Sequence, residues 1–181
     1  SWSGRVAAPF SYERFLCSTD EAVLKILSHY TKEGRNDWER DFLVGGAEQV
    51  ERQLHEAASR SPVRFIHLLA EHWVDIPDRF RDDILDGAAT YLAHRHGHLH
   101  FDTNQWVPIE KPDPQILANL ILDEIERHPA HWHHCRVAAK ALDACANVIQ
   151  DEQDASRLLF AAIGFLNHRE KDFDNNEIDL I

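Results

Sequence analysis

The residues of this chain that are best spaced for chemistry are four histidines at alternate positions: His94, His96, His98 and His100. Side chains two positions apart point to the same side of an extended backbone, so the four rings would share one face. Imidazoles gathered in this way can bind zinc, nickel or copper when a carboxylate or thiolate completes the site. The last three histidines and Asp102 are therefore a candidate metal site of a hydrolase. The alternative is that the rings mark the polar end of a helix near Gly97.

A second group of ligand-type residues lies around a proline: His128, His131, His133, His134 and Cys135. Positions three apart lie on the same side of a helix, so His131 and His134 are expected to be neighbours. Trp132 and the apolar pattern compete for the same sides of this helix. We interpret the group as polar rings at a helix entrance, which carry partial positive charge in an acidic protein.

The rest of the sequence contains no recognised catalytic or nucleotide-binding motif. It has no GxxxxGK[ST] phosphate loop, no GxSxG turn and no CxxC pair. His67, Glu71 and His72 follow the spacing HxxxEH, and five helical positions separate the two rings by about 140°, which is too far to share one metal. We therefore expect no catalytic residue and no cofactor in this chain.

The elements that must position these residues are six or seven segments with apolar residues at helical spacing. Short breaks marked by proline or glycine separate them, and the predicted helices cover residues 22–30, 47–61, 62–73, 77–97, 112–128, 137–149 and 151–166. Helices joined by short turns pack as antiparallel neighbours. The pattern predicts an all-α fold of consecutive antiparallel hairpins, a HEAT-like α-solenoid segment; a closed helical bundle is the competing architecture.

The last of these helices has a candidate N-cap and a long apolar stripe. Asp151 precedes it, and a carboxylate there can accept a hydrogen bond from a free backbone N–H. The stripe consists of Ala155, Leu158, Leu159, Ala162, Phe165 and Leu166. Since these positions share one side of a helix, we expect them to face a core.

The chain is expected to form one helical-repeat domain over residues 1–181. It contains no methionine, which suggests a fragment of a longer chain. Residues 97–112 lack helical periodicity and are predicted to be the longest loop, either a connector or a functional excursion. Residues 170–181 mix acids with apolar residues and are predicted to be a linker-like tail.

Composition restricts the partners. The formal net charge of −12 disfavours phosphate backbones, so no nucleic-acid partner is expected. No apolar run is long enough to span a bilayer, so no membrane partner is expected either. Three cysteines, an odd number, are typical of a reduced, cytoplasmic protein.

Tryptophans are the candidate contact residues for a protein partner, because this residue type contributes strongly to interface energy. Four of them lie near predicted helix ends or in loops: Trp38, Trp73, Trp106 and Trp132. The alternative for each is a local hydrophobic plug.

Two blocks of sequence resemble a known family. RDFLVGGAEQVERQLHEAASRSPVRFIHLL, from Arg40 to Leu69, and IPDRFRDDILDGAATYL, from Ile76 to Leu92, resemble the helical-repeat region that follows the nucleotide-binding core of large bacterial STAND-type (NACHT-like) ATPases. The family has a Gly-Gly turn, a helix and two Pro-started helices in this order. Residues Asp143 to Leu166, which end in DEQDASRLLFAAIGFL, are similar to the next hairpin.

The resemblance implies a HEAT-like array that serves as a sensor, scaffold or oligomer contact for an ATPase in the same polypeptide. Some members of the family act in antiviral defence by recognising phage proteins. The nucleotide-binding motifs are absent here, so ATP hydrolysis is not implied for this chain. A non-catalytic interaction segment of this kind would expose an apolar edge at its ends, and its partner would be another protein or another domain of the same polypeptide.

Overall fold

The computed structural model describes residues 8–32, 46–97 and 105–178. Within these ranges the chain forms nine α-helices and no strand, which confirms the predicted all-α class. The helices are α1 (Glu13–Cys17), α2 (Asp20–Lys32), α3 (Ala47–Arg60), α4 (Pro62–Glu71), α5 (Asp78–His96), α6 (Pro114–Arg127), α7 (Pro129–Trp132), α8 (Arg136–Ala146) and α9 (Glu152–Ile178).

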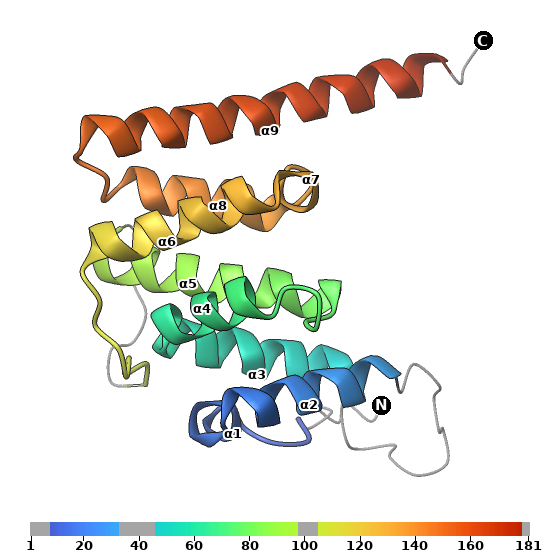
Figure 1. Ribbon diagram of the computed structural model, residues 1–181, viewed down its shortest axis with the longest axis vertical. Coiled ribbons are helices and arrows are strands. Elements are labelled where there is room, and N and C mark those ends of the chain that lie inside the picture. Colours follow the sequence, from blue (N-terminus) through green and yellow to red (C-terminus); the bar gives the residue numbers. More distant parts are fainter. Residues whose placement is uncertain (1–7, 33–45, 98–104, 179–181) are drawn as a thin grey trace, which may run out of the picture.

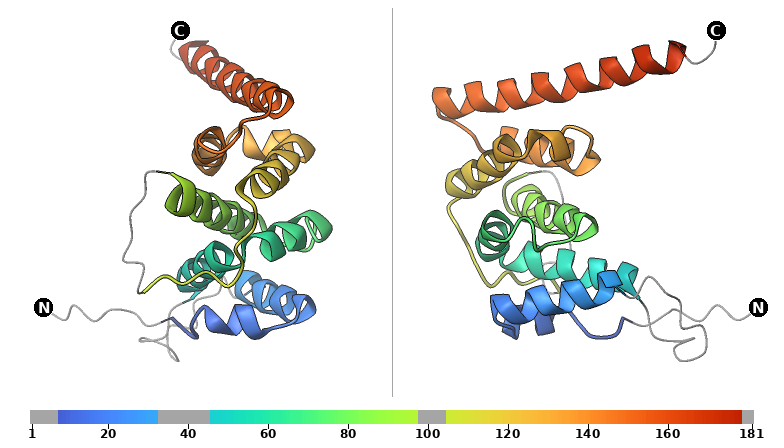
Figure 2. Two further views of the ribbon diagram at one scale, coloured as in Figure 1. Left: turned by 90° about the vertical axis from the view of Figure 1, so that its left-hand side faces the viewer. Right: turned by 45° about the vertical axis from the view of Figure 1, so that its right-hand side comes forward.

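The helices follow one another along the long axis of the molecule, from α1 and α2 at one end to α9 at the other (Figure 1). One row is formed by α3, α5 and α8, in which α5 packs extensively on both neighbours. A second row, with α4 and α6, lies beside the first (Figure 2). Helix α9 closes the stack by packing on α6 and α8.

The tightest helix contact joins α3 and α5 at Gly87. A Cβ atom added to this glycine would lie 2.5 Å from the Cβ of Ala58 and 2.7 Å from the carbonyl oxygen of His55. Real Cβ atoms do not approach other atoms so closely, so the two helices can adopt this separation only because position 87 has no side chain. The most extensive interface of the stack therefore depends on one glycine.

Prolines begin helices where the sequence predicted breaks. Pro62, Pro114 and Pro129 are the first residues of α4, α6 and α7. Proline is tolerated there because the first turn of a helix needs no backbone N–H donor. The Asp113 carboxylate completes the start of α6, since it accepts hydrogen bonds from the N–H groups of Gln115 and Ile116 at 2.9 and 3.2 Å.

The described part of the predicted long loop, residues 105–112, is fixed to the junction of α3 and α4. The backbone N–H groups of Ile109 and Glu110 donate to the Arg60 carbonyl at 2.8 and 3.0 Å. The Glu110 carboxylate accepts from the Ser61 hydroxyl at 2.7 Å and from the Val63 N–H at 2.8 Å. It thus caps α4 from a distant part of the chain.

The ends of the chain depart from the predictions in two places. Helix α1 was not predicted; the guanidinium of Arg64 holds its end by donating to the carbonyls of Phe15, Leu16 and Ser18. The predicted linker-like tail is helical as far as Ile178, because no proline or glycine interrupts the chain after Gly164.

None of the helices in the described ranges is both long and apolar enough to cross a membrane.

Candidate protein-interaction face

Helix α9 begins at the N-cap predicted from the sequence. The Asp151 carboxylate accepts hydrogen bonds from the N–H groups of Gln153 and Asp154 at 3.0 and 3.1 Å. These bonds satisfy two of the donors that a helix start leaves free. The first turn of α9 is therefore well defined, and it sets the direction of the whole helix.

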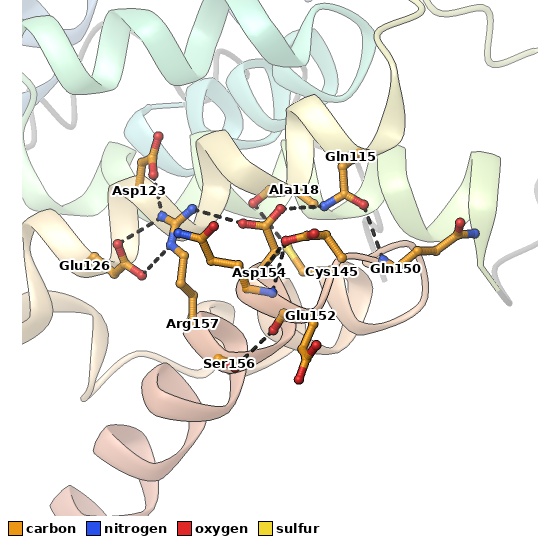
Figure 3. Close-up of polar contacts among 12 residues, drawn as sticks. Gln115, Ala118, Asp123, Glu126, Cys145, Gln150, Glu152, Asp154, Ser156 and Arg157 are labelled. Carbon is orange, nitrogen blue, oxygen red and sulfur yellow. Dashed lines mark hydrogen bonds and ion pairs between the residues drawn. The ribbon is translucent and has the colours of Figure 1, made fainter.

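Polar contacts then fix this first turn on α6 (Figure 3). The Gln115 side chain donates to the Asp154 carboxylate at 2.9 Å and accepts from the backbone N–H of Gln150 at 3.3 Å. Gln115 thus bridges the loop before α9 and the first turn of α9. Both contacts involve the start of α6, so the two helix starts lie together.

Arg157 is the second attachment point. Its guanidinium donates to both carboxylate oxygens of Glu126, at 3.0 and 2.9 Å, and to Asp123. The hydrogen bonds to Glu126 raise the pKa of Arg157 above its usual value, so this side chain stays charged. Ion pairs with two carboxylates in fixed geometry are among the stronger polar contacts of a protein surface. The rotation of α9 about its own axis is therefore set.

This attachment turns one side of α9 toward the stack. Ala161 is buried, and Leu158 and Ala162 pack against the core. A Cβ atom on Gly164 would lie 2.9 Å from the ring of His133, so α9 also passes close to the end of α7. The prediction that Leu158 and Ala162 face a core is confirmed.

Between residues 155 and 167, the opposite side of α9 is exposed and uncharged. We call it the α9 outer face, and it consists of Ala155, Ser156, Leu159, Phe160, Ile163, Leu166 and Asn167. The exposed fractions are 62% for Leu159, 79% for Phe160, 45% for Ile163 and 59% for Leu166. These positions span about 140° around the helix axis, with Ile163 at the centre. The prediction that Ala155, Leu159 and Leu166 face a core is wrong, because all three are exposed. Apolar residues occupy both the packed and the exposed side of α9.

Segment 158–166 of α9 has the composition of a buried helix, although charged residues flank it on both sides. Residues 158–166 include no charged and no hydrogen-bonding side chain. Helix α5 is a useful comparison within the chain. Its residues 87–92 are all buried, because neighbouring helices pack on α5 from several sides. A helix that is apolar all round is expected to be covered all round. In the described part of the chain, α9 is covered on one side only.

The tryptophans are mostly part of the packing. Trp132 is completely buried, and Trp106 is 8% exposed with its indole N–H donating to the Ser59 hydroxyl at 3.0 Å. Neither can contact a partner, because helices already cover both. Trp73 is half-buried and lies between the guanidinium of Arg81, 4.1 Å from its ring, and the imidazole of His128, stacked at 3.6 Å. Trp38 lies outside the described residues.

The predicted metal site is only partly within the described ranges. His98, His100 and Asp102 lie outside them, while His96 ends α5. Burial, together with the neighbouring Arg95, lowers the pKa of His96. Among the residues that the structure does describe, no three His, Cys, Asp or Glu side chains are arranged to hold a metal ion.

Three members of the second histidine group, His131, His134 and Cys135, line a pocket that the sequence did not reveal. His131 pairs with Asp82 of α5 at 3.0 Å, and both line a surface pocket of about 550 Å³ together with Cys135. Burial raises the pKa of the Cys135 thiol to about 11. A thiol must be deprotonated to act as a nucleophile, so this raised pKa disfavours Cys135 as a nucleophile at neutral pH. This pocket resembles a Cys-His-Asp site in composition but not in electrostatics.

Asp83 is the most perturbed carboxyl of the described chain. Burial, together with the nearby carboxylates of Glu51, Asp82 and Asp86, raises its pKa to about 8. The adjacent Asp86 behaves differently: burial acts to raise its pKa, but hydrogen bonds from His55 and Lys140 lower it overall. Asp83 is therefore a protonated, structural carboxyl at neutral pH.

No family model, curated protein or solved structure matches this chain. Its function must therefore be inferred from its own residues. Among the features described above, the α9 outer face is the one that packing within the described chain does not explain.

Proposed function

We propose that this chain is a non-catalytic protein-interaction and scaffold segment, built as a HEAT-like array of helical hairpins, which binds a further helix across the α9 outer face. The observation that carries this proposal is the uncharged apolar surface of α9, which is held outward by the Arg157 and Gln115 contacts. A contiguous apolar patch of this kind on a soluble domain is typical of a protein interface.

The kind of partner follows from the surface. The α9 outer face is a ridge of exposed side chains along one helix, and none of its residues carries a charge that could steer a ligand. Ridges of this type pack into the grooves of another helix. The α5 helix, covered by helices on both sides of its row, provides the precedent within the chain. The expected occupant is therefore an amphipathic helix with an uncharged apolar face.

The resemblance to STAND-type ATPases supports a wider context for this role. In that context the chain is the sensor or scaffold part of a larger bacterial ATPase, with a role in antiviral defence as in some members of the family. This part of the proposal depends only on the sequence blocks Arg40–Leu69, Ile76–Leu92 and Asp143–Leu166. It is tested by the gene: an upstream phosphate loop in the same reading frame supports it, and a reading frame without one refutes it.

The second hypothesis, a metal-dependent hydrolase, stays a prediction. It depends on His98, His100 and Asp102, which lie outside the described residues. Stoichiometric zinc in protein purified without a histidine tag would support it. Metal-free protein with the same thermal stability in chelator would refute it.

The interaction role is tested with the natural gene product in its own cells. Phe160→Glu places a charge at the most exposed apolar residue of the outer face, and the expected result is a smaller native assembly by size-exclusion chromatography. Val74→Glu is the matched control, because Val74 is an exposed apolar residue (85%) in the turn between α4 and α5. An assembly whose size is the same in both variants and in the wild type would overturn the proposal.

A further inference from the structure

The α9 outer face has the properties of a self-complementary surface. Its central residue is Ile163, with Phe160 on one side along the helix and Leu166 on the other. If a two-fold axis passes through Ile163, the helix of a second copy runs antiparallel. Ile163 then faces its own counterpart, and Phe160 of each copy faces Leu166 of the other. A contact of this kind is isologous, because the same patch is used by both copies.

We propose that the helix that covers the α9 outer face is α9 of a second copy of this chain, and that the chain forms an antiparallel α9–α9 dimer. This inference rests on the proposed function and names its partner. It requires no additional ligand and no change in the fold, since α9 lies at one end of the stack of described helices (Figure 1).

The available area is consistent with a weak dimer. Side chains of Leu, Ile and Phe present roughly 150–200 Å² each when fully exposed, so the exposed fractions of the four apolar residues leave roughly 400 Å² per copy. With the small flanking residues of the outer face, two copies would bury roughly 1,000–1,200 Å², the lower limit of specific interfaces. We therefore expect a dissociation constant on the order of 10 μM.

Charge imposes a second, independent requirement on this dimer. Each copy carries a net charge of −12, so two copies repel each other at long range. The outer face itself is neutral, and Arg157 neutralises the acids nearest to it on α6, Glu126 and Asp123. Apolar contact can therefore form once salt screens the remaining charge, and the dimer should become tighter as salt is added. A contact held by opposite charges would become weaker.

Sedimentation velocity of the 181-residue chain between 1 and 200 μM tests this inference. The expected result is a shift from the monomer mass of 20.9 kDa toward twice that mass, with a larger dimer fraction at 300 mM than at 20 mM NaCl. Phe160→Glu should stay monomeric at all concentrations, and Val74→Glu should dimerise like the wild type. Circular dichroism of both variants shows whether they are folded.

A covalent trap tests the two-fold axis. In a Cys17→Ser background, which removes the exposed native thiol, Ile163→Cys should form a disulfide-linked dimer under mild oxidation, and Val74→Cys should not. A monomer under all conditions, or equal dimerisation of Phe160→Glu, would overturn the inference. If the chain is monomeric but Phe160→Glu still reduces the size of the natural assembly, the dimer is wrong and the proposed interaction role is retained with a different helix.

Discussion

Replacing Gly87 by alanine should separate α3 from α5 and destabilise the whole stack. The added methyl group would lie 2.5 Å from the Ala58 Cβ, 2.7 Å from the His55 carbonyl oxygen and 2.9 Å from the Ser59 backbone nitrogen. Two of these atoms belong to the backbone of α3 and cannot rotate away. The helices must therefore move apart, and over-packing of this kind typically costs about 1–3 kcal/mol.

Helix propensity acts in the opposite direction. Alanine within a helix is favoured over glycine by about 1 kcal/mol, so the net destabilisation expected for Gly87→Ala is up to about 2 kcal/mol. The matched control is Gly164→Ala in α9, where the new methyl group meets only the ring of His133 at 2.9 Å. The nearest atoms of that ring belong to a side chain and not to a helix backbone, so the control should cost less stability than Gly87→Ala and gain at most about 1 kcal/mol.

Urea unfolding followed by circular dichroism at 25 °C measures both variants. The expected result is a lower midpoint for Gly87→Ala than for Gly164→Ala, with unchanged slopes. If Gly87→Ala is stabilised as much as Gly164→Ala, then α3 and α5 do not approach each other as described. The central contact of the stack would then be wrong.

Three further predictions concern single side chains. Asp83→Asn should be more stable than the wild type at pH 8 and should lose this advantage toward pH 5. The folded pKa of Asp83, about 8, lies above its unfolded value, so the stability of the wild type falls as pH rises between the two values, by at most about 1.4 kcal/mol per pH unit. Urea midpoints of both proteins at pH 5, 6.5 and 8 measure this difference, and parallel pH curves would refute the prediction. Glu110→Ala should lower the free energy of unfolding by about 1–2 kcal/mol, because it removes the cap of α4. The control Glu48→Ala removes only an exposed ion pair and should cost less than about 0.5 kcal/mol. Equal losses of stability in thermal unfolding would contradict the role of Glu110 as a cap. Iodoacetamide at pH 7.5 should modify the exposed Cys17 well before the half-buried Cys135, whose pKa is raised to about 11. Intact mass over time measures the order of modification, and the reverse order would contradict the raised pKa of Cys135.

The positions of most helices could be predicted because their signals are local. Proline marks the start of α4, α6 and α7, and apolar periodicity identifies the helices between them. Helix α1 has only five residues, and Arg64 supports it from a position far along the chain, so no local signal reveals it. The charged residues after Asn167 hide the continuation of α9, because they provide no apolar stripe.

The candidate site was predictable in kind but not in its residues. An exposed apolar edge was expected, but periodicity alone placed Leu159 and Leu166 in a core. The uninterrupted apolar run of residues 158–166 was the signal that α9 has two apolar sides. Conversely, Trp106 and Trp132 lie near helix ends in the sequence, where exposure is common, but neighbouring helices in the stack cover both. Burial of this kind depends on tertiary contacts that no local pattern contains.

Site-specific photo-crosslinking tests the central claim, that the α9 outer face is a binding surface for a helix. A photoreactive residue replaces Phe160 in the natural gene product, and Val74 is replaced in a parallel sample. The account predicts efficient crosslinks from position 160 that map to one helical segment, α9 of a second copy in the first instance, and few from position 74. Equal or absent crosslinking at the two positions would contradict it, because α9 would then be an exposed helix without a partner.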